Sequence, residues 1–134
     1  SLVLAGPGEP NIPISQYPNI FNLNWVNPEE KQTLLQNAEA LLYPSLYEGF
    51  GLPILEAFDA GMPIITSNCA SMPEVAGDAA LLVNPKNTQE IADAMEKIIK
   101  NPDLKNELIQ KGKERLKNFS WEKCARQTMK NILT

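Results

Sequence analysis

Histidine is absent from this chain of 134 residues, and its absence removes several kinds of active site at once. Without an imidazole there is no Ser-His-Asp or Cys-His triad, no HExxH zinc site and no histidine general base. Any catalysis must therefore use carboxylates, lysine, arginine, hydroxyl groups or backbone dipoles.

Cysteines and long apolar runs are also scarce. Cys69 and Cys124 are the two cysteines, and their separation matches neither a CxxC motif nor a zinc-site spacing. We expect both to be reduced, as in a reducing compartment. No apolar run approaches the ~20 residues that span a bilayer, and no signal sequence opens the chain. These features predict a cytoplasmic location, with peripheral attachment to the cytoplasmic face of a membrane as the alternative.

Positive charge is almost missing from the first part of the chain. Residues 1–85 hold nine acids and one base, Lys31, whereas residues 86–134 hold eleven bases and seven acids. The net charge of −4 argues against a nucleic-acid partner. The basic second part fits solvated helix faces, or a patch that faces an acidic membrane or another domain.

Short apolar runs alternate with helix-start signals along one domain, residues 1–134. Strands are expected at 2–5, 20–23, 40–43, 63–66 and 80–83. Helices are expected from residue 28, over 52–60, and from residues 71, 87 or 88, 101 and 120. This alternation predicts an α/β fold whose parallel sheet is covered by helices on both faces.

Several helix details follow from local residue types. Asn27 and Glu30 form a predicted capping box, and Ser71 with Glu74 is expected to start a helix in the same way. Trp121, which follows a predicted Ser120 cap, is expected to anchor the last helix in the core. Two buried helix faces are predicted: Leu34, Leu35 and Ala38 in one, and Ile91, Ala94, Met95 and Ile98 in the other.

The loop after the third predicted strand carries the candidate site. Ligands of parallel α/β sheets bind where strands end and helices begin. Gly49 and Gly51 are expected to allow positive φ angles and close backbone approach, ahead of a helix whose free N–H groups and dipole favour an anion. The features fit a phosphate site, and they also fit a tight turn without a ligand. Tyr43 and Tyr47 are expected to be packing residues, and Ser67, Asn68 and Ser71 to cap or to touch a ligand.

Glu48 and Glu56 add a second chemistry to this loop. A carboxylate repels phosphate but accepts strong hydrogen bonds from the hydroxyl groups of a sugar. Glu56 lies roughly 7–8 Å along the helix from its start, at 1.5 Å per residue, which is about the reach from a pyrophosphate to its ribose. The layout fits a nucleotide sugar, although the spacing alone equally fits two solvent-exposed glutamates.

The segment PSLYEGFGLPILEA resembles the donor-binding signature of retaining GT-B glycosyltransferases, the glycosyl transferases group 1 family. The hallmark of that family is two glutamates separated by seven residues, here Glu48 and Glu56. Further segments resemble the family in the same order: LVLAGPGE, NWVNPEEKQTLLQNAEALLYPS, GMPIITSNCASMPEVAGDAALLVNP and FSWEKCA. The resemblance implies that residues 1–134 are most of the Rossmann-like, three-layer C-terminal domain of a GT-B fold.

The resemblance also implies roles for single residues. Glu48 is the expected catalytic residue, which hydrogen-bonds hydroxyls of the donor sugar and stabilises charge at its anomeric carbon, while Glu56 binds the ribose diol. The other expected contacts are the phosphates at the N–H groups of Gly49, Phe50 and Gly51, the nucleotide at Leu52, and the base at Trp25 and Val26.

The implied reaction moves a sugar from a UDP-, GDP- or ADP-linked donor to an acceptor hydroxyl with retention. No cofactor or metal is expected, and the sequence has no DxD motif. The acceptor would be a sugar, lipid or polysaccharide held by an N-terminal domain that this chain lacks. The chain also lacks the first strand and loop of its own domain, which in the family supply an Arg and a Lys to the diphosphate. We therefore expect the fragment alone to be inactive and to bind a donor poorly.

Two other interpretations of the function stay open. The chain could be a non-catalytic module that binds a nucleotide or sugar, or part of another GT-B-fold enzyme such as a phosphorylase or sugar-nucleotide epimerase. A lysine placed for pyridoxal phosphate would mark the phosphorylase, and none is evident near the motif.

Overall fold

The computed structural model describes all residues except Glu9, Asn11 and Thr134, and it divides the chain into two compact units, residues 1–34 and 35–134. Each unit is considered by itself. Glu9 ends the LVLAGPGE segment and lies outside the described residues. The expected α/β character with parallel strands is confirmed in both units.

The first unit contains a two-stranded parallel sheet. Strands β1 (Leu2–Leu4) and β2 (Ile20–Asn22) pair in parallel, and the short 3-10 helix η1 (Ile14–Gln16) lies between them in sequence. Helix α1 (Pro28–Asn37) begins in this unit and continues into the next. Its capping box is confirmed, because Asn27 Oδ1 accepts from the Glu30 N–H at 2.9 Å and the Asn27 N–H donates to Glu30 Oε2 at 2.8 Å.

The second unit is built around a three-stranded parallel sheet in the order β3-β4-β5. Its elements are β3 (Leu41–Tyr43), α2 (Leu52–Asp59), β4 (Ile64–Ser67), α3 (Met72–Ala76), β5 (Leu81–Val83), α4 (Thr88–Lys100), α5 (Pro102–Leu116) and α6 (Trp121–Ile132). The central strand β4 is buried along its whole length. Its neighbours pair with it in register, with Tyr43 opposite Thr66 and Ser67 opposite Val83.

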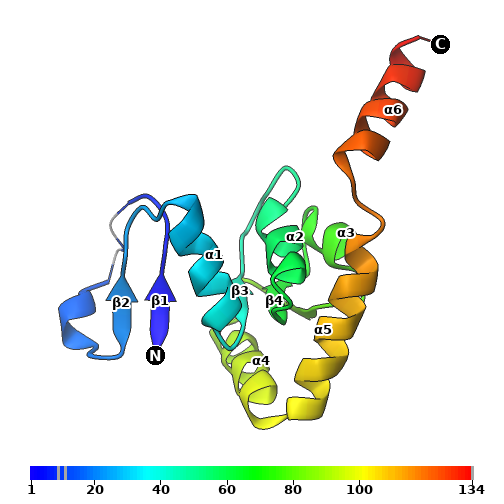
Figure 1. Cartoon of the computed structure of the whole chain (residues 1–134). Helices are drawn as coiled ribbons and strands as arrows, with labels where there is room; N and C mark the ends of the chain where they lie inside the picture. Colours follow the sequence, from blue (N-terminus) through cyan, green and yellow to red (C-terminus); the bar gives the residue numbers. More distant parts are fainter. Residues whose placement is uncertain (9, 11, 134) are drawn as a thin grey trace. The chain divides into compact units, whose positions relative to one another are not determined.

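Helices cover both faces of this sheet. Ile64 packs with Phe58 of α2 and Met72 of α3, whereas Ile65, the next residue of β4, packs with Ile98 of α4. Figure 1 shows α2 and α4 on opposite sides of β3 and β4, and α5 contributes residues to both clusters. Side chains of a strand alternate between faces, so two adjacent isoleucines secure two helix layers. The predicted three-layer arrangement is confirmed.

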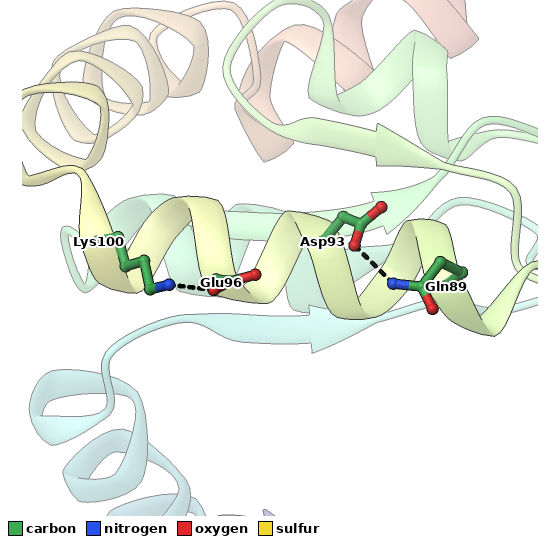
Figure 2. A network of polar contacts seen from close by, with 4 residues as sticks. All are labelled: Gln89, Asp93, Glu96 and Lys100. Atoms are coloured by element: carbon green, nitrogen blue, oxygen red, sulfur yellow. Dashed lines mark hydrogen bonds and ion pairs between the residues drawn. The ribbon is translucent and has the colours of Figure 1, made fainter.

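Helix α4 has one buried face and one solvent-exposed face. Ala94 and Ile98 are buried, as predicted for this helix, with Ile91 and Met95 packed beside them. On the solvent side, Gln89 hydrogen-bonds Asp93 and Lys100 pairs with Glu96, as Figure 2 shows. These i,i+4 pairs on an exposed surface contribute only about 0.3–0.5 kcal/mol each, so the buried face positions α4.

Three predictions about helix residues are wrong, because the sequence pattern does not contain the tertiary packing. Trp121 is 80% exposed rather than buried, and every described residue of α6 is exposed. Ala38 is exposed, while Leu34 and Leu35 of the same predicted face are half-buried. Ser71 precedes α3 but makes no side-chain cap, because its hydroxyl donates elsewhere.

In the part of the chain that the structure describes, no helix combines the length and apolarity needed to cross a membrane.

Candidate functional site

The candidate loop joins β3 to α2 at the carboxyl edge of the three-stranded sheet. Strand β3 ends at Tyr43, and α2 begins at Leu52 with Pro53 in its first turn. Residues 44–51 therefore occupy the position at which parallel α/β sheets bind ligands. The loop exposes the side chains of Leu46, Tyr47 and Phe50. Tyr43 packs against the core as expected, but Tyr47 is 80% exposed, so its expected packing role is wrong.

The two glycines of the loop differ in conformation. Gly51 has φ +102°, and a Cβ at this position would lie 3.3 Å from Ile54 Cδ1, so the fold itself requires glycine there. Gly49 is not in the positive-φ region, and a Cβ on it would meet nothing within 4 Å. The prediction of positive φ is thus right for Gly51 and wrong for Gly49. The fold gives no reason for glycine at position 49.

The start of α2 presents backbone donors without a side-chain cap. Gly51 is the N-cap residue and accepts from the Ile54 N–H at 3.0 Å, Pro53 has no N–H, and Gly51 has no side chain to bind the N–H of Leu52, the first residue of the helix. The positive end of the helix dipole adds to these donors. This combination favours an anion beside residues 49–52.

Phe50 of this loop is anchored from the distant end of α5. Its ring meets the ring of Phe119 edge-on, with centroids 6.0 Å apart. The Arg115 guanidinium lies 5.5 Å from the same Phe119 centroid and donates to the backbone carbonyls of Glu74 and Val75. The Phe50 ring, between the two glycines, is therefore held by Phe119, and the cation–π contact with Arg115 holds the Phe119 ring in turn.

Glu48 is held at both its side chain and its main chain. Ser45 Oγ donates to Glu48 Oε1 at 3.0 Å, and Ser71 Oγ donates to the Glu48 carbonyl at 3.0 Å. The residue is half-buried, and its carboxylate keeps acceptor capacity beyond the Ser45 bond because each oxygen has two lone pairs.

Glu56 lies in the middle of α2. The pKa of Tyr43 responds to both Glu48 and Glu56. The pKa of Tyr43 is raised to about 12, first by burial and then by a hydrogen bond to Glu48 and the charges of Glu48 and Glu56, while the neighbouring Ser45 hydroxyl lowers it. Both predicted carboxylates therefore lie within electrostatic range of the Tyr43 phenol. The sequence analysis did not predict that the Tyr43 phenol interacts with Glu48. The position of Tyr43 at the end of β3, two residues before Ser45, was the signal that could have indicated it.

Trp25 and Val26 belong to the first unit and are described there alone. Trp25 is 76% exposed, which excludes a core role, and Val26 is half-buried. The preceding Asn24 has φ +53°, and the Asn22 side chain accepts from its N–H at 3.2 Å. An asparagine tolerates this left-handed conformation, which turns the chain directly before Trp25.

A hollow of about 370 Å³ opens beside the loop in the second unit. Its lining follows the ends of three strands and consists of Leu46, Asn68, Cys69, Asn84, Pro85 and Lys86. Neither predicted glutamate lines this hollow, and Lys86 is the cation among its lining residues.

Acidic and sulfur side chains do not gather into a metal site in the described ranges 1–8, 10 and 12–133. No group of three or more histidine, cysteine, aspartate or glutamate side chains there could hold an ion. The expectation of a metal-free reaction stays a prediction.

The raised pKa of Tyr43 predicts that its phenol loses its proton at a higher pH than an ordinary tyrosine. In a difference titration by ultraviolet absorbance against Tyr43→Phe, the Tyr43 phenolate should form with a midpoint of about 12 rather than the ordinary 10. The pKa of Tyr43 is higher in the folded protein than in the unfolded chain. The contribution of the neutral Tyr43 phenol to the free energy of unfolding is therefore complete below pH 10 and is lost as the pH rises towards 12. Glu48→Gln should lower the midpoint, and a wild-type midpoint near 10 would show that the Tyr43 phenol is neither buried nor close to the carboxylates.

Comparisons with known proteins identify the family of this chain. Residues 16–115 match the family described as Glycosyl transferases group 1. O-antigen chain mannosyltransferase B of Escherichia coli is 39% identical over 107 residues, which cover 80% of this chain and 28% of that protein. The MMP alpha-(1->4)-mannosyltransferase of Mycolicibacterium hassiacum is 37% identical over 108 residues, which cover 78% of this chain and 26% of that protein. The chain thus spans about a quarter of the length of these relatives.

Solved structures share the fold. Sucrose-phosphate synthase from Thermosynechococcus elongatus superposes with a TM-score of 0.83 at 25% identity, covering 98% of this chain and 37% of that one. Anabaena HepE, in complex with UDP and glucose, gives a TM-score of 0.84 at 16% identity, covering 98% of this chain and 40% of that one. With three quarters of its residues inside the family match, this chain belongs to the glycosyl transferases group 1 family.

Proposed function

We propose that this chain forms the donor-binding part of a retaining glycosyltransferase that uses a nucleotide sugar. One observation carries the proposal: residues 43–56 combine two carboxylates, both within electrostatic range of the Tyr43 phenol, with a helix start that has no side-chain cap. Carboxylates suit hydroxyl groups and the helix start suits phosphate, and a nucleotide sugar contains both.

Glu48 and Glu56 take different parts of the donor. Glu48 precedes the helix start and is proposed to accept hydrogen bonds from hydroxyls of the transferred sugar and to stabilise positive charge that develops at its anomeric carbon. Glu56, one turn further along α2, is proposed to bind the ribose diol. Fixed carboxylates act strongly on a developing charge because they need no reorganisation during the reaction.

The backbone and apolar contacts complete the proposed donor site. The N–H groups of Gly49, Phe50 and Gly51 are proposed to hold the diphosphate, and Leu52 to pack against the nucleotide. Trp25 and Val26 are proposed to contact the base. No cofactor or metal is required in this scheme, and the acceptor binds outside these residues.

The names of relatives and neighbours support this donor class. The two curated relatives are mannosyltransferases, and Anabaena HepE has been solved both with UDP and glucose and with UDP-glucose. The base and the sugar differ among such proteins, so a mannosyl donor with GDP and a glucosyl donor with UDP are the first to test.

The share of the relatives that this chain covers supports a larger protein. The chain spans 28% of O-antigen chain mannosyltransferase B and 26% of the MMP alpha-(1->4)-mannosyltransferase. We propose that the whole protein supplies the first strand of this domain, with its loop, and an N-terminal domain for the acceptor. Residues 1–134 alone should then be inactive, and turnover by them would contradict this.

Two isosteric variants test the assignment in the full-length enzyme. Glu48→Gln should lower kcat about 100-fold with GDP-mannose or UDP-glucose, because it weakens stabilisation of a developing charge. Its Kd for GDP or UDP should stay within about twofold, since a diphosphate lacks the sugar. Glu56→Gln should weaken diphosphate and nucleotide sugar alike, about tenfold, because both contain ribose.

Glu96→Gln is the matched control, because it makes the same change of charge on the exposed face of α4 (Figure 2). Glu96→Gln should leave both kcat and the Kd for GDP or UDP unchanged. If Glu48→Gln and Glu56→Gln behave like this control, or if the wild type binds no UDP-, GDP- or ADP-linked sugar, the proposed function is wrong.

A pair of glycine variants tests the phosphate site separately. Gly49→Ala should keep the apparent Tm, because the fold leaves open space at that Cβ, but should weaken diphosphate binding about tenfold if phosphate approaches this backbone. Gly51→Ala should instead destabilise the protein by about 1–3 kcal/mol through its positive φ. Unchanged diphosphate affinity of Gly49→Ala would place the phosphates elsewhere.

A further inference from the structure

Three hydroxyl groups downstream in the chain hold the segment that carries Glu48. Thr66 Oγ1 donates to the Tyr43 carbonyl at 2.9 Å, Ser67 Oγ donates to the Ser45 carbonyl, and Ser71 Oγ donates to the Glu48 carbonyl at 3.0 Å. We call the hydroxyls of Thr66, Ser67 and Ser71 the hydroxyl clamp. Each bond spans 22 or 23 residues of sequence.

The hydroxyl clamp extends the pairing of β3 and β4 beyond the end of the ladder. The strand register ends near Tyr43 and Thr66, where the chain after β3 turns into the loop. Thr66 and Ser67 are fully buried, so these hydroxyls are in a region where an unmade hydrogen bond is costly. The clamp therefore fixes the path of residues 43–48 relative to β4.

Ser71 shows that the clamp serves the loop rather than a helix. It occupies the N-cap position of α3, where a serine usually bonds an N–H of the first turn. Here its φ and ψ of −78° and −16° are helical, and its hydroxyl makes no cap bond but donates to Glu48. The hydroxyl thus forgoes helix stabilisation in favour of the main chain of the proposed catalytic residue.

Ser45 adds control of the carboxylate itself. Its own carbonyl is held by Ser67, and its hydroxyl donates to Glu48 Oε1 at 3.0 Å. The carboxylate is thereby restricted in rotation while its remaining lone pairs stay available to a ligand. A group held in this way loses little conformational entropy when a substrate binds.

We infer that Ser45 and Ser71 are positioning residues for Glu48, Ser45 through the direction of its carboxylate and Ser71 through its main chain. The inference rests on the proposed function of Glu48. It assigns the two serines to the sugar end of the donor, so their loss affects transfer of the sugar and spares recognition of the nucleotide.

The test uses Ser45→Ala and Ser71→Ala in the full-length enzyme, with GDP-mannose and UDP-glucose as donors and GDP and UDP as sugar-free ligands. Each variant should lower kcat with the active donor by about tenfold or more, because misplacing one group costs ~10–100-fold. The Kd of the matching diphosphate should stay within about twofold. Ser45→Thr keeps a hydroxyl and should recover most of the lost rate.

Ser15→Ala, in η1, is the control for loss of a serine hydroxyl, and thermal unfolding of each variant reports folding. If Ser45→Ala and Ser71→Ala match the control in kcat while Glu48→Gln abolishes transfer, the positioning role is wrong and the proposed function stands. If diphosphate affinity and Tm fall together with kcat, the serines are merely structural and the inference is also overturned. If Glu48→Gln has no effect either, the proposed function itself fails.

Discussion

Burial of β4 on both faces is the constraint on which the second unit depends. Ile64 and Ile65 are almost fully buried, and because adjacent strand residues point to opposite faces, each closes a different helix layer. The same strand ends in Thr66 and Ser67, whose buried hydroxyls bind the chain that leaves β3. The strand that forms the core therefore also fixes the start of the candidate loop.

The loop combines a fixed side with an open side. Glu48 is held through Ser45 and Ser71, and Phe50 is held through Phe119. Gly49, in contrast, faces open space and has a conformation that any residue adopts. Functional groups act best when neighbouring contacts fix them before the ligand arrives, and a ligand needs uncovered backbone to approach. Both conditions occur within residues 45–51.

Much of the fold could be predicted because its signals are local. The Asn27–Glu30 capping box involves residues three apart, and the alternation of apolar runs with helix starts gave the element order. The two glutamates were also found from the sequence, since their spacing is visible without knowledge of any partner. The helix expected over 52–60 is observed as α2 with Ala60 as its C-cap residue, and Gly61 follows with φ +69°, a conformation typical of helix ends.

The missed features depend on tertiary packing that the local sequence pattern does not contain. The polar role of Tyr43 arises from burial and from Glu48 and Glu56, and Ser71 bonds a carbonyl 23 residues upstream instead of capping α3. Trp121 begins a helix as predicted, yet no core residue in the described chain covers it. Capping and amphipathic patterns do not say which tertiary partner a hydroxyl or ring will meet, so these predictions failed.

Hydrogen–deuterium exchange of the full-length enzyme, with and without a saturating nucleotide sugar, tests the central claim most directly. Binding at the loop should slow exchange of the amides in residues 44–56, because the donor would cover the helix start and its N–H groups. Glu56→Gln should reduce that protection at equal ligand concentration. A donor that is bound and turned over while exchange of residues 44–56 stays unchanged would contradict the assignment of this loop as the donor site.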